Sequence, residues 1–229
     1  HIELAKPVFH PGFIKKIKKI LEMVCHNCGK ILLDRSNPAF KQAVSIRDPK
    51  RRFDTIWRLC KPKMICDADS NDEPNPDGKE GPVSQHGGCG NTQPEVRQTA
   101  LQLWGTWKVP KDEDGESTQP EKRLITPENA LHVFKAMSSA QIRDLGLSND
   151  YARPEWLVIT VLPVPPPPVR PSVSMDGTGQ GMRGEDDLTY KLGDIIRANS
   201  NVRQAQQEGS PAHILQDFEQ LLQYHVATY

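Results

Sequence analysis

Five cysteines are the residues of this 229-residue sequence whose types and spacing point most directly to chemistry. Cys25 and Cys28 form a C-x-x-C pair in the segment CHNCGK, and Cys89 lies between glycines in GGCGN. Two residues between cysteines allow both thiolates of a tight turn to bind one ion, and a structural zinc ion takes four such ligands in a tetrahedron. The two glycine-rich turns therefore indicate three ligands of a zinc site.

The fourth ligand is Cys60 or Cys66, and the surrounding sequence favours Cys66. Cys60 falls on the apolar stripe of a helix expected over residues 48–60, where a free cysteine is usually a core residue. Cys66 follows Pro62 in irregular chain, where a thiolate can be aimed at an ion. We predict a zinc site with four ligands, Cys25, Cys28, Cys66 and Cys89.

Two other uses of these cysteines are disfavoured. An odd number of cysteines and a C-x-x-C pair argue against a disulfide framework. A redox pair normally begins a helix after a strand, whereas this pair follows an expected helix and leads into Gly-Lys. Four thiolate ligands leave no position for water, so the ion is expected to be structural and not catalytic. His26, between the first two ligands, is expected to face solvent.

Hydrophobic periodicity predicts an α+β fold in which helices dominate and strands are few and short. Helices are expected over residues 12–24 and 48–60, from Thr126, around 140–145, after the acidic Glu185-Asp186-Asp187 and from Pro211. Strands are expected in 101–107 and in 157–162. On the last helix, the residues expected to face inward are Ile214, Leu215, Phe218, Leu221 and Leu222.

Charge and polarity restrict the classes of function. Lys+Arg and Asp+Glu both number 29, so contacts with nucleic acid must come from local patches. One such patch is a lysine stripe on the helix at 12–24, which is either a solvated face or a phosphate-binding one. Residues 67–81 and 111–122 are expected to be mobile surface loops. No stretch approaches the roughly 20 apolar residues of a membrane span, and both ends look like those of a fragment.

The segment LVITVLPVPPPPVRPSVSM, residues 157–175, joins an apolar run to prolines and then to a glycine-rich loop. We expect 157–162 to be a buried strand and 163–171 to be a stiff polyproline rod of about 3.1 Å per residue. The rod would carry Met175 at an apolar tip. GTGQGMRG, within the loop, lacks the GK[ST] ending of a phosphate-binding loop, and nothing in the sequence predicts a catalytic centre.

Several motifs in chain order resemble the N-terminal clamp region of the largest subunit of eukaryotic RNA polymerase II, with a fungal character. They are HIELAKPVFHPGF, VCHNCGK with GGCGNTQP, RPEWLVITVLPVPPPPVRPSVS, GEDDLTYKLGDIIRAN and LLQYHVATY. The resemblance implies an irregular, zinc-stabilised clamp fragment. Residues 1–150 would be a clamp head with the zinc-binding segment, and 151–229 a part of the clamp core.

The resemblance also implies a role in transcription. The clamp would close over DNA and the RNA–DNA hybrid, and a lid loop at about 169–188 would help to part RNA from template. The residues expected to meet nucleic acid there are Arg170, Ser174, Met175 and Arg183. The complete enzyme is a nucleotidyltransferase whose Mg²⁺ and catalytic residues lie outside this chain. Its partners would be the other polymerase subunits and the initiation and elongation factors that bind the clamp, and its location the nucleus.

A second hypothesis makes no use of the polymerase. A zinc-stabilised interaction module could present PVPPPPVRP as a ligand for SH3 or WW domains, which bind proline-rich segments in the polyproline conformation. This hypothesis requires the segment to be exposed along its length and to keep that conformation.

Overall fold

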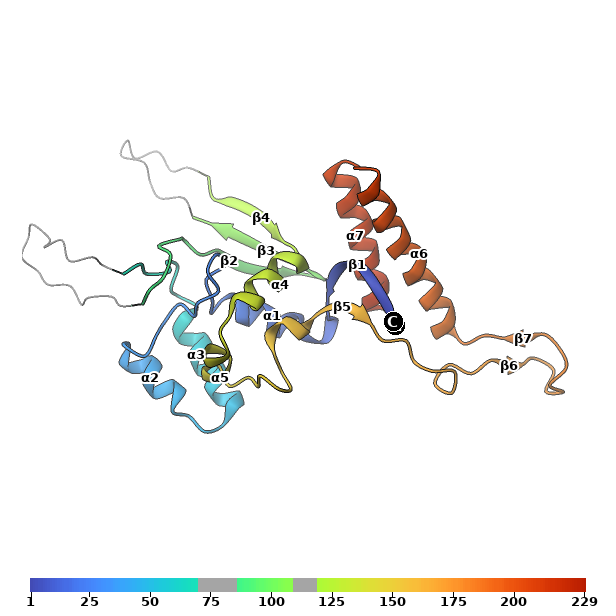
Figure 1. Cartoon of the computed structure of the whole chain (residues 1–229), viewed down its shortest axis with the longest axis horizontal. Helices are drawn as coiled ribbons and strands as arrows, with labels where there is room; N and C mark the ends of the chain where they lie inside the picture. Colours follow the sequence, from blue (N-terminus) through green and yellow to red (C-terminus); the bar gives the residue numbers. More distant parts are fainter. Residues whose placement is uncertain (70–85, 109–118) are drawn as a thin grey trace, which may run out of the picture. The chain divides into compact units, whose positions relative to one another are not determined.

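The computed structural model describes residues 1–69, 86–108 and 119–229 (Figure 1). The chain forms two compact units, each with its own internal contacts. We call residues 12–157 the cysteine unit and residues 1–11 with 158–229 the helical unit. Most of the two segments expected to be mobile loops, 70–81 and 111–118, lies outside the described residues.

The two units separate nearly the same parts of the chain as the expected division at residue 150. The difference is that residues 1–11 belong with the C-terminal segment and 151–157 with the cysteine unit. The roles given to the two parts, clamp head and clamp core, remain predictions. The helices and short antiparallel strands within both units confirm the α+β class.

The described residues of the cysteine unit form five α-helices, four of which begin at a side-chain cap. They are α1 (Ile14–Leu21), α2 (Pro38–Val44), α3 (Pro49–Cys60), α4 (Pro127–Ala136) and α5 (Ser139–Asp144), with short 3-10 turns η1 (Pro11–Phe13) and η2 (Pro154–Leu157). Asp48, Thr126 and Ser138 each accept a backbone N–H at a helix start, which is the role of an N-cap. Gly146 ends the region of α5 with φ +81°. Only α2 was not expected from the sequence.

The cysteine unit also contains one antiparallel sheet in the order β2-β3-β4, formed by β2 (Glu95–Thr99), β3 (Gln102–Trp107) and β4 (Glu121–Ile125). The sequence predicted β3 alone, and 121–122, expected to be loop, belong to β4. Val96, Leu103 and Ile125 are buried on one face of the sheet. β2 and β3 are joined by a two-residue turn at Ala100 and Leu101, where Ala100 has φ +51°.

The helical unit places two long helices against a two-stranded sheet. β1 (Ile2–Phe9) pairs with β5 (Val158–Leu162), while α6 (Asp187–Gln207) and α7 (Ala212–Ala227) pack on each other and on β1 (Figure 1). Asp186 caps α6, as the acidic run predicted. The buried residues of the core are Val8, Leu162, Ile195, Ala198, Val202, Leu222 and Val226.

Two expectations for this unit were wrong in detail. The strand β5 is only half-buried, because it has one partner strand and leaves Val161 48% exposed. On α7, Ile214 and Leu221 are exposed, and Val226 and Gln223 are buried instead. The buried face of α7 therefore includes Gln223, whose side chain bonds to the backbone of β1, and is rotated from the face that the apolar residues predicted.

Side-chain amides of the helices complete the hydrogen bonding of β1. Gln223 of α7 accepts from the Phe9 backbone N–H at 2.7 Å and donates to the Phe9 carbonyl at 2.9 Å. Asn199 of α6 accepts from Ala5 N–H at 2.6 Å and donates to the Glu3 carbonyl at 2.9 Å. Both amides are buried, so each acts as a substitute for a neighbouring strand at an edge that would otherwise lack partners.

Between β5 and α6 the chain forms an arm that ends in a hairpin, β6 (Val173–Ser174) paired with β7 (Arg183–Gly184) (Figure 1). The stiff polyproline rod predicted at 163–171 was wrong. Val169 N–H donates to Pro166 O at 3.0 Å and Arg170 N–H to Pro167 O at 3.1 Å, so the prolines close turns. The polyproline helix has no internal hydrogen bonds, and the arm is therefore bent at this point.

Among the described residues, no helix is long and apolar enough to cross a bilayer.

Candidate metal centre

The first cysteine pair lies in a tight knuckle that follows α1. Cys25 N–H donates to Lys30 O at 2.8 Å and Gly29 N–H to Cys25 O at 2.9 Å, while Leu32 N–H donates to Met23 O at 2.9 Å. Gly29 has φ +72°, and a Cβ there would lie 2.7 Å from Ala136 Cβ at the end of α4. The turn therefore requires glycine at this position, and it presents both thiols on one side.

The second knuckle joins segments that are far apart in the sequence. Cys66 N–H donates to Asn91 O at 3.0 Å, and Gly90 N–H donates to Cys66 O at 2.8 Å. Ile65 and Thr92 form an antiparallel bridge beside these bonds. These bonds thus fix Cys66 close to Cys89. The residues between 69 and 86 lie outside the described part of the chain.

The four cysteines predicted as ligands lie together. Their sulfur atoms are all within 4.8 Å of one another, with Cys25 Sγ 3.4 Å from Cys89 Sγ and Cys28 Sγ 3.8 Å from Cys66 Sγ. Disulfide sulfurs would be about 2.05 Å apart, and all four cysteines are free thiols. A tetrahedral zinc ion with bonds of about 2.3 Å would separate its sulfur ligands by about 3.8 Å. The cluster therefore has the size of a four-thiolate metal site.

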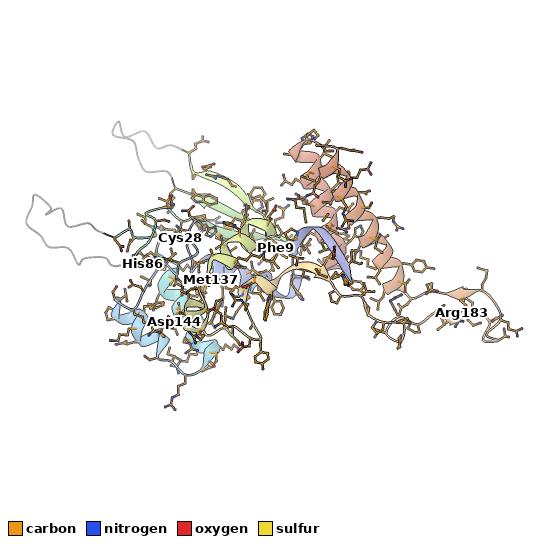
Figure 2. The ribbon with its side chains drawn as sticks, viewed as in Figure 1. Phe9, Cys28, His86, Met137, Asp144 and Arg183 are labelled. Atoms are coloured by element: carbon orange, nitrogen blue, oxygen red, sulfur yellow. The ribbon has the colours of Figure 1, made fainter. Side chains whose placement is uncertain are left out.

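Hydrogen-bond donors surround these sulfurs. Gln93 Nε2 donates to Cys25 Sγ at 3.2 Å, and Asn91 Nδ2 donates to Cys89 Sγ at 3.3 Å. His86 Nε2 lies 3.9 Å from Cys66 Sγ, and Figure 2 labels His86 and Cys28 near each other in this unit. Donors around sulfur stabilise thiolate, the form that binds a metal. The groups that surround the sulfurs thus suit metal ligation.

The burial of two of the four thiols favours a bound metal. Desolvation raises the pKa of Cys25 and of Cys66 above the usual value. Desolvation also acts on Cys89, but hydrogen bonds from the Asn91 backbone and from Asn27 outweigh it and lower the pKa of Cys89 to about 6. Cys25 and Cys66 are buried, Cys28 is half-buried and Cys89 is exposed. A group of four thiols at such close range is stabilised by a cation that displaces their protons. The residues present therefore fit a structural zinc ion.

Two further expectations about this region have opposite outcomes. Cys60 is fully buried on α3 and lies outside the cluster, in agreement with the choice of Cys66. His26 does not face solvent. Its Nε2 lies 2.9 Å from the Leu21 carbonyl oxygen, its ring contacts Trp107 edge-on at 6.3 Å, and burial lowers its pKa.

The lysine stripe of α1 is largely engaged within the cysteine unit. Lys19 Nζ bonds to Asp54 at 2.7 Å, and Lys16 Nζ lies 3.4 Å from the centre of the Phe53 ring. Lys18 pairs with Glu22 at 3.4 Å. These contacts to α3 and along α1 favour the solvated, internally paired face over a phosphate-binding patch.

The four residues predicted for the lid have different surroundings. Arg170 Nε donates to Pro165 O at 2.9 Å and its guanidinium lies 3.4 Å from Thr189 Oγ1, so it ties the base of the arm to α6. Ser174 Oγ donates to Asp176 Oδ1 at 2.6 Å and accepts from Gly179 N–H at 3.3 Å, which shapes the turn. Met175 is 75% exposed, and Arg183, labelled on the arm in Figure 2, is exposed as well.

Sequence reasoning missed residues whose importance depends on distant pairing. Gln93, 5% exposed, bonds to the Cys25 sulfur and to the His26 N–H, and only its place two residues after GGCGN hints at this role. Met182, 82% exposed, lies beside Met175 because Met175 N–H donates to Met182 O at 3.1 Å across the hairpin. The hairpin tip therefore carries two methionines and not one.

The chain matches the family described as RNA polymerase Rpb1, domain 1, over residues 1–229, its whole length. It belongs to that family and is a region of the largest subunit of a DNA-directed RNA polymerase, an enzyme of the nucleotidyltransferase class.

Proposed function

We propose that this chain is part of the clamp of RNA polymerase II, stabilised by a structural Zn²⁺ ion, and that its hairpin arm is a lid that helps to separate RNA from template. The family membership supports the polymerase context. The observation that carries the lid role is the pair of exposed methionines, Met175 and Met182, at the end of the projecting hairpin.

Zn²⁺ would be held by Cys25, Cys28, Cys66 and Cys89. When bound, such an ion supplies folding free energy and no reaction chemistry, because four thiolates fill its coordination sphere. The residues themselves join the knuckle after α1 to the knuckle around residues 66 and 89. The zinc site would thus keep this part of the clamp surface rigid.

The hairpin has the properties that a wedge between strands requires. An apolar tip can stack against an opening base pair without competing for its hydrogen bonds. Arg183 beside the tip donates to Ser172 O at 3.2 Å but is exposed, so its guanidinium can approach phosphate, whereas Arg170 bonds at the base of the arm. A fixed base keeps the tip from being pushed aside, and here the Arg170 contacts replace the stiffness expected of a proline rod.

The remaining roles follow from the polymerase context. We assign no catalytic residue to this chain, and the magnesium ions of nucleotide addition would be bound by other parts of the complete enzyme. The chain would contact the other subunits, the DNA template and the RNA–DNA hybrid, as well as initiation and elongation factors that bind the clamp. Its place of action would be the nucleus.

The test of the lid is a complete polymerase carrying Met175→Ser and Met182→Ser together. We expect transcripts to stay paired with template beyond the normal hybrid length, which RNase H sensitivity of the upstream RNA measures. The matched control is Met175→Leu with Met182→Leu, which keeps an apolar tip and should release RNA normally. Normal hybrid length in the serine enzyme would rule out the lid role.

The hypothesis of a ligand for SH3 or WW domains is disfavoured. Pro166–Val169 are exposed, as such a ligand requires. However, the two hydrogen bonds that close turns at Pro166 and Pro167 remove the polyproline conformation that these domains bind.

A further inference from the structure

We propose that a groove on the cysteine unit binds an extended segment of a partner protein that carries large apolar side chains flanked by acidic residues. The groove lies between the end of α1, the end of α3 and the start of β2. This inference goes beyond the polymerase role and does not depend on it.

The main part of the groove is a cavity of about 470 Å³ with an apolar floor. That volume falls within the usual range of about 300–1,000 Å³ for binding pockets and accommodates one or two large side chains. Leu21, Leu32 and Val96 at its floor are buried. Its remaining lining includes Trp57, Pro62, Met64 and Pro94.

A second cavity of about 230 Å³ continues the first. Both are lined by Met64, Gln93 and Glu95, so they form one elongated groove. Along it, Met64 is 37% and Ile65 is 51% exposed. Exposed apolar side chains beside an apolar cavity are typical of a protein-binding surface. The elongated shape favours an extended peptide, which could place successive side chains in the two cavities, over a compact small molecule.

The charges of the groove favour an acidic partner. Arg58, Lys61 and Lys63 line the first cavity, and Lys108 lines the second. Lys63 pairs with Asp67, while Arg58 and Lys61 project from the exposed end of α3 and the turn after it. Cations at the edge of an apolar groove attract carboxylates that flank an inserted side chain.

The two acidic side chains of the groove already have partners. Glu22 accepts from Trp57 Nε1 at 2.6 Å and pairs with Lys18 at 3.4 Å. Glu95 pairs with Arg97 at 2.9 Å. The charge that remains for a ligand is therefore positive.

A protein segment fits this groove better than a nucleic acid does. Base stacking needs an open aromatic face, but Lys19 and Lys61 lie 4.6 and 5.0 Å from the centre of the Trp57 ring. The floor is otherwise aliphatic and offers no second aromatic face to a base. Aliphatic or aromatic side chains, by contrast, would bury apolar surface against Leu21, Leu32 and Val96.

The wall that the two cavities share is fixed before any ligand binds. Gln93 N–H donates to Met64 O at 2.7 Å, and Gln93 Nε2 donates to Cys25 Sγ and to Asn91 O at 3.2 and 2.9 Å. The groove is thus built on the knuckles of the metal centre. A preorganised wall lowers the entropic cost of binding an extended chain.

The test is selection of a random dodecapeptide library on the zinc-loaded 229-residue chain, followed by fluorescence anisotropy of the selected peptides. We expect a consensus with a large apolar residue and Asp or Glu within three positions. The double variant Arg58→Glu, Lys61→Glu, which changes exposed side chains only, should weaken binding at least about tenfold. The control Lys41→Glu, an exposed charge reversal on α2, should leave it unchanged.

Three results would overturn the proposal. They are the absence of any enriched consensus, a consensus without acidic residues, and equal binding by the Arg58→Glu, Lys61→Glu variant and the parent chain. A labelled single-stranded oligonucleotide serves as the competing probe. Its binding in place of peptide, lost in the same variant, would identify the groove as a nucleic-acid site and likewise overturn the proposal.

Discussion

The sulfur atoms of Cys25 and Cys89 lie 3.4 Å apart, although 64 positions separate the two residues in the chain. The distance is too long for a disulfide and suits two thiolates on one ion. Each sulfur also accepts a hydrogen bond from a side-chain amide, Cys25 from Gln93 and Cys89 from Asn91. The two knuckles of the cysteine unit are therefore arranged around a common centre.

Gln93→Ala should weaken metal binding about 10- to 100-fold, which is the usual effect of removing a group that hydrogen-bonds to a metal ligand. The substitution removes the donor to Cys25 Sγ and leaves the His26 N–H without its acceptor. Competition with a chromophoric zinc chelator measures the affinity. Gln42→Ala, at an exposed site of α2, is the matched control, and equal affinities of the two variants would contradict the role of Gln93.

Cys60 predicts a pH dependence of stability. Burial raises the pKa of Cys60 from 9.0 to about 12. Between those values the unfolded thiol loses its proton and the folded one keeps it, so the free energy of unfolding should fall as pH rises, by up to about 1.4 kcal/mol per pH unit. Urea titrations from pH 8 to 10.5 measure this slope, and Cys60→Ala should make it shallower by the contribution of this one thiol. A slope that is the same in both proteins would contradict the prediction.

Gln223→Leu should destabilise the helical unit by about 2 kcal/mol, because it leaves the buried N–H and C=O of Phe9 without partners. Urea denaturation gives the stability, and amide exchange of Phe9 reports the site directly. Gln220→Leu makes the same chemical change on the exposed side of α7 and should cost little. Fast exchange at Phe9 in the Gln220 variant as well would show that α7 itself had been disturbed.

Ala100→Gly should stabilise the cysteine unit by about 0.5–1 kcal/mol. Ala100 occupies the first central position of the β2–β3 turn with φ +51°, a conformation that glycine adopts without steric cost. Thermal unfolding measures the gain. Ala140→Gly, in the exposed part of α5, should instead destabilise by about 1 kcal/mol. Destabilisation by both substitutions would show that the turn carries no strain.

Local signals in the sequence were sufficient for most of the capped helices and for the cluster of cysteines, although α2, which begins at Asn37-Pro38 in the same way, was missed. Asp48-Pro49 and Thr126-Pro127 mark helix starts by side chains that act within a few residues. The C-x-x-C pair and the glycines beside Cys89 mark turns in the same way. Pro62 ends the helix between Cys60 and Cys66. This signal placed Cys60 in the core and Cys66 in the cluster.

The features that were missed depend on partners far along the chain. β1 contains Pro7 and a register shift between Glu3 and Val8, and its backbone groups bond to Asn199 and Gln223. No window of the sequence shows such pairing. The proline run was misjudged for a different reason: its turns are closed by local bonds, from Val169 N–H to Pro166 O and from Arg170 N–H to Pro167 O. The distant contact at this point is the one between the Arg170 guanidinium and Thr189 on α6.

The central claim is that Cys25, Cys28, Cys66 and Cys89 hold one structural zinc ion. Its most direct test is the metal content of the purified chain by inductively coupled plasma mass spectrometry, compared between the parent, Cys28→Ser and Cys60→Ser. We predict one zinc per chain in the parent and in Cys60→Ser, and loss of zinc with loosening of the fold in Cys28→Ser. A full equivalent of zinc in Cys28→Ser, or its loss in Cys60→Ser alone, would contradict the four-cysteine centre.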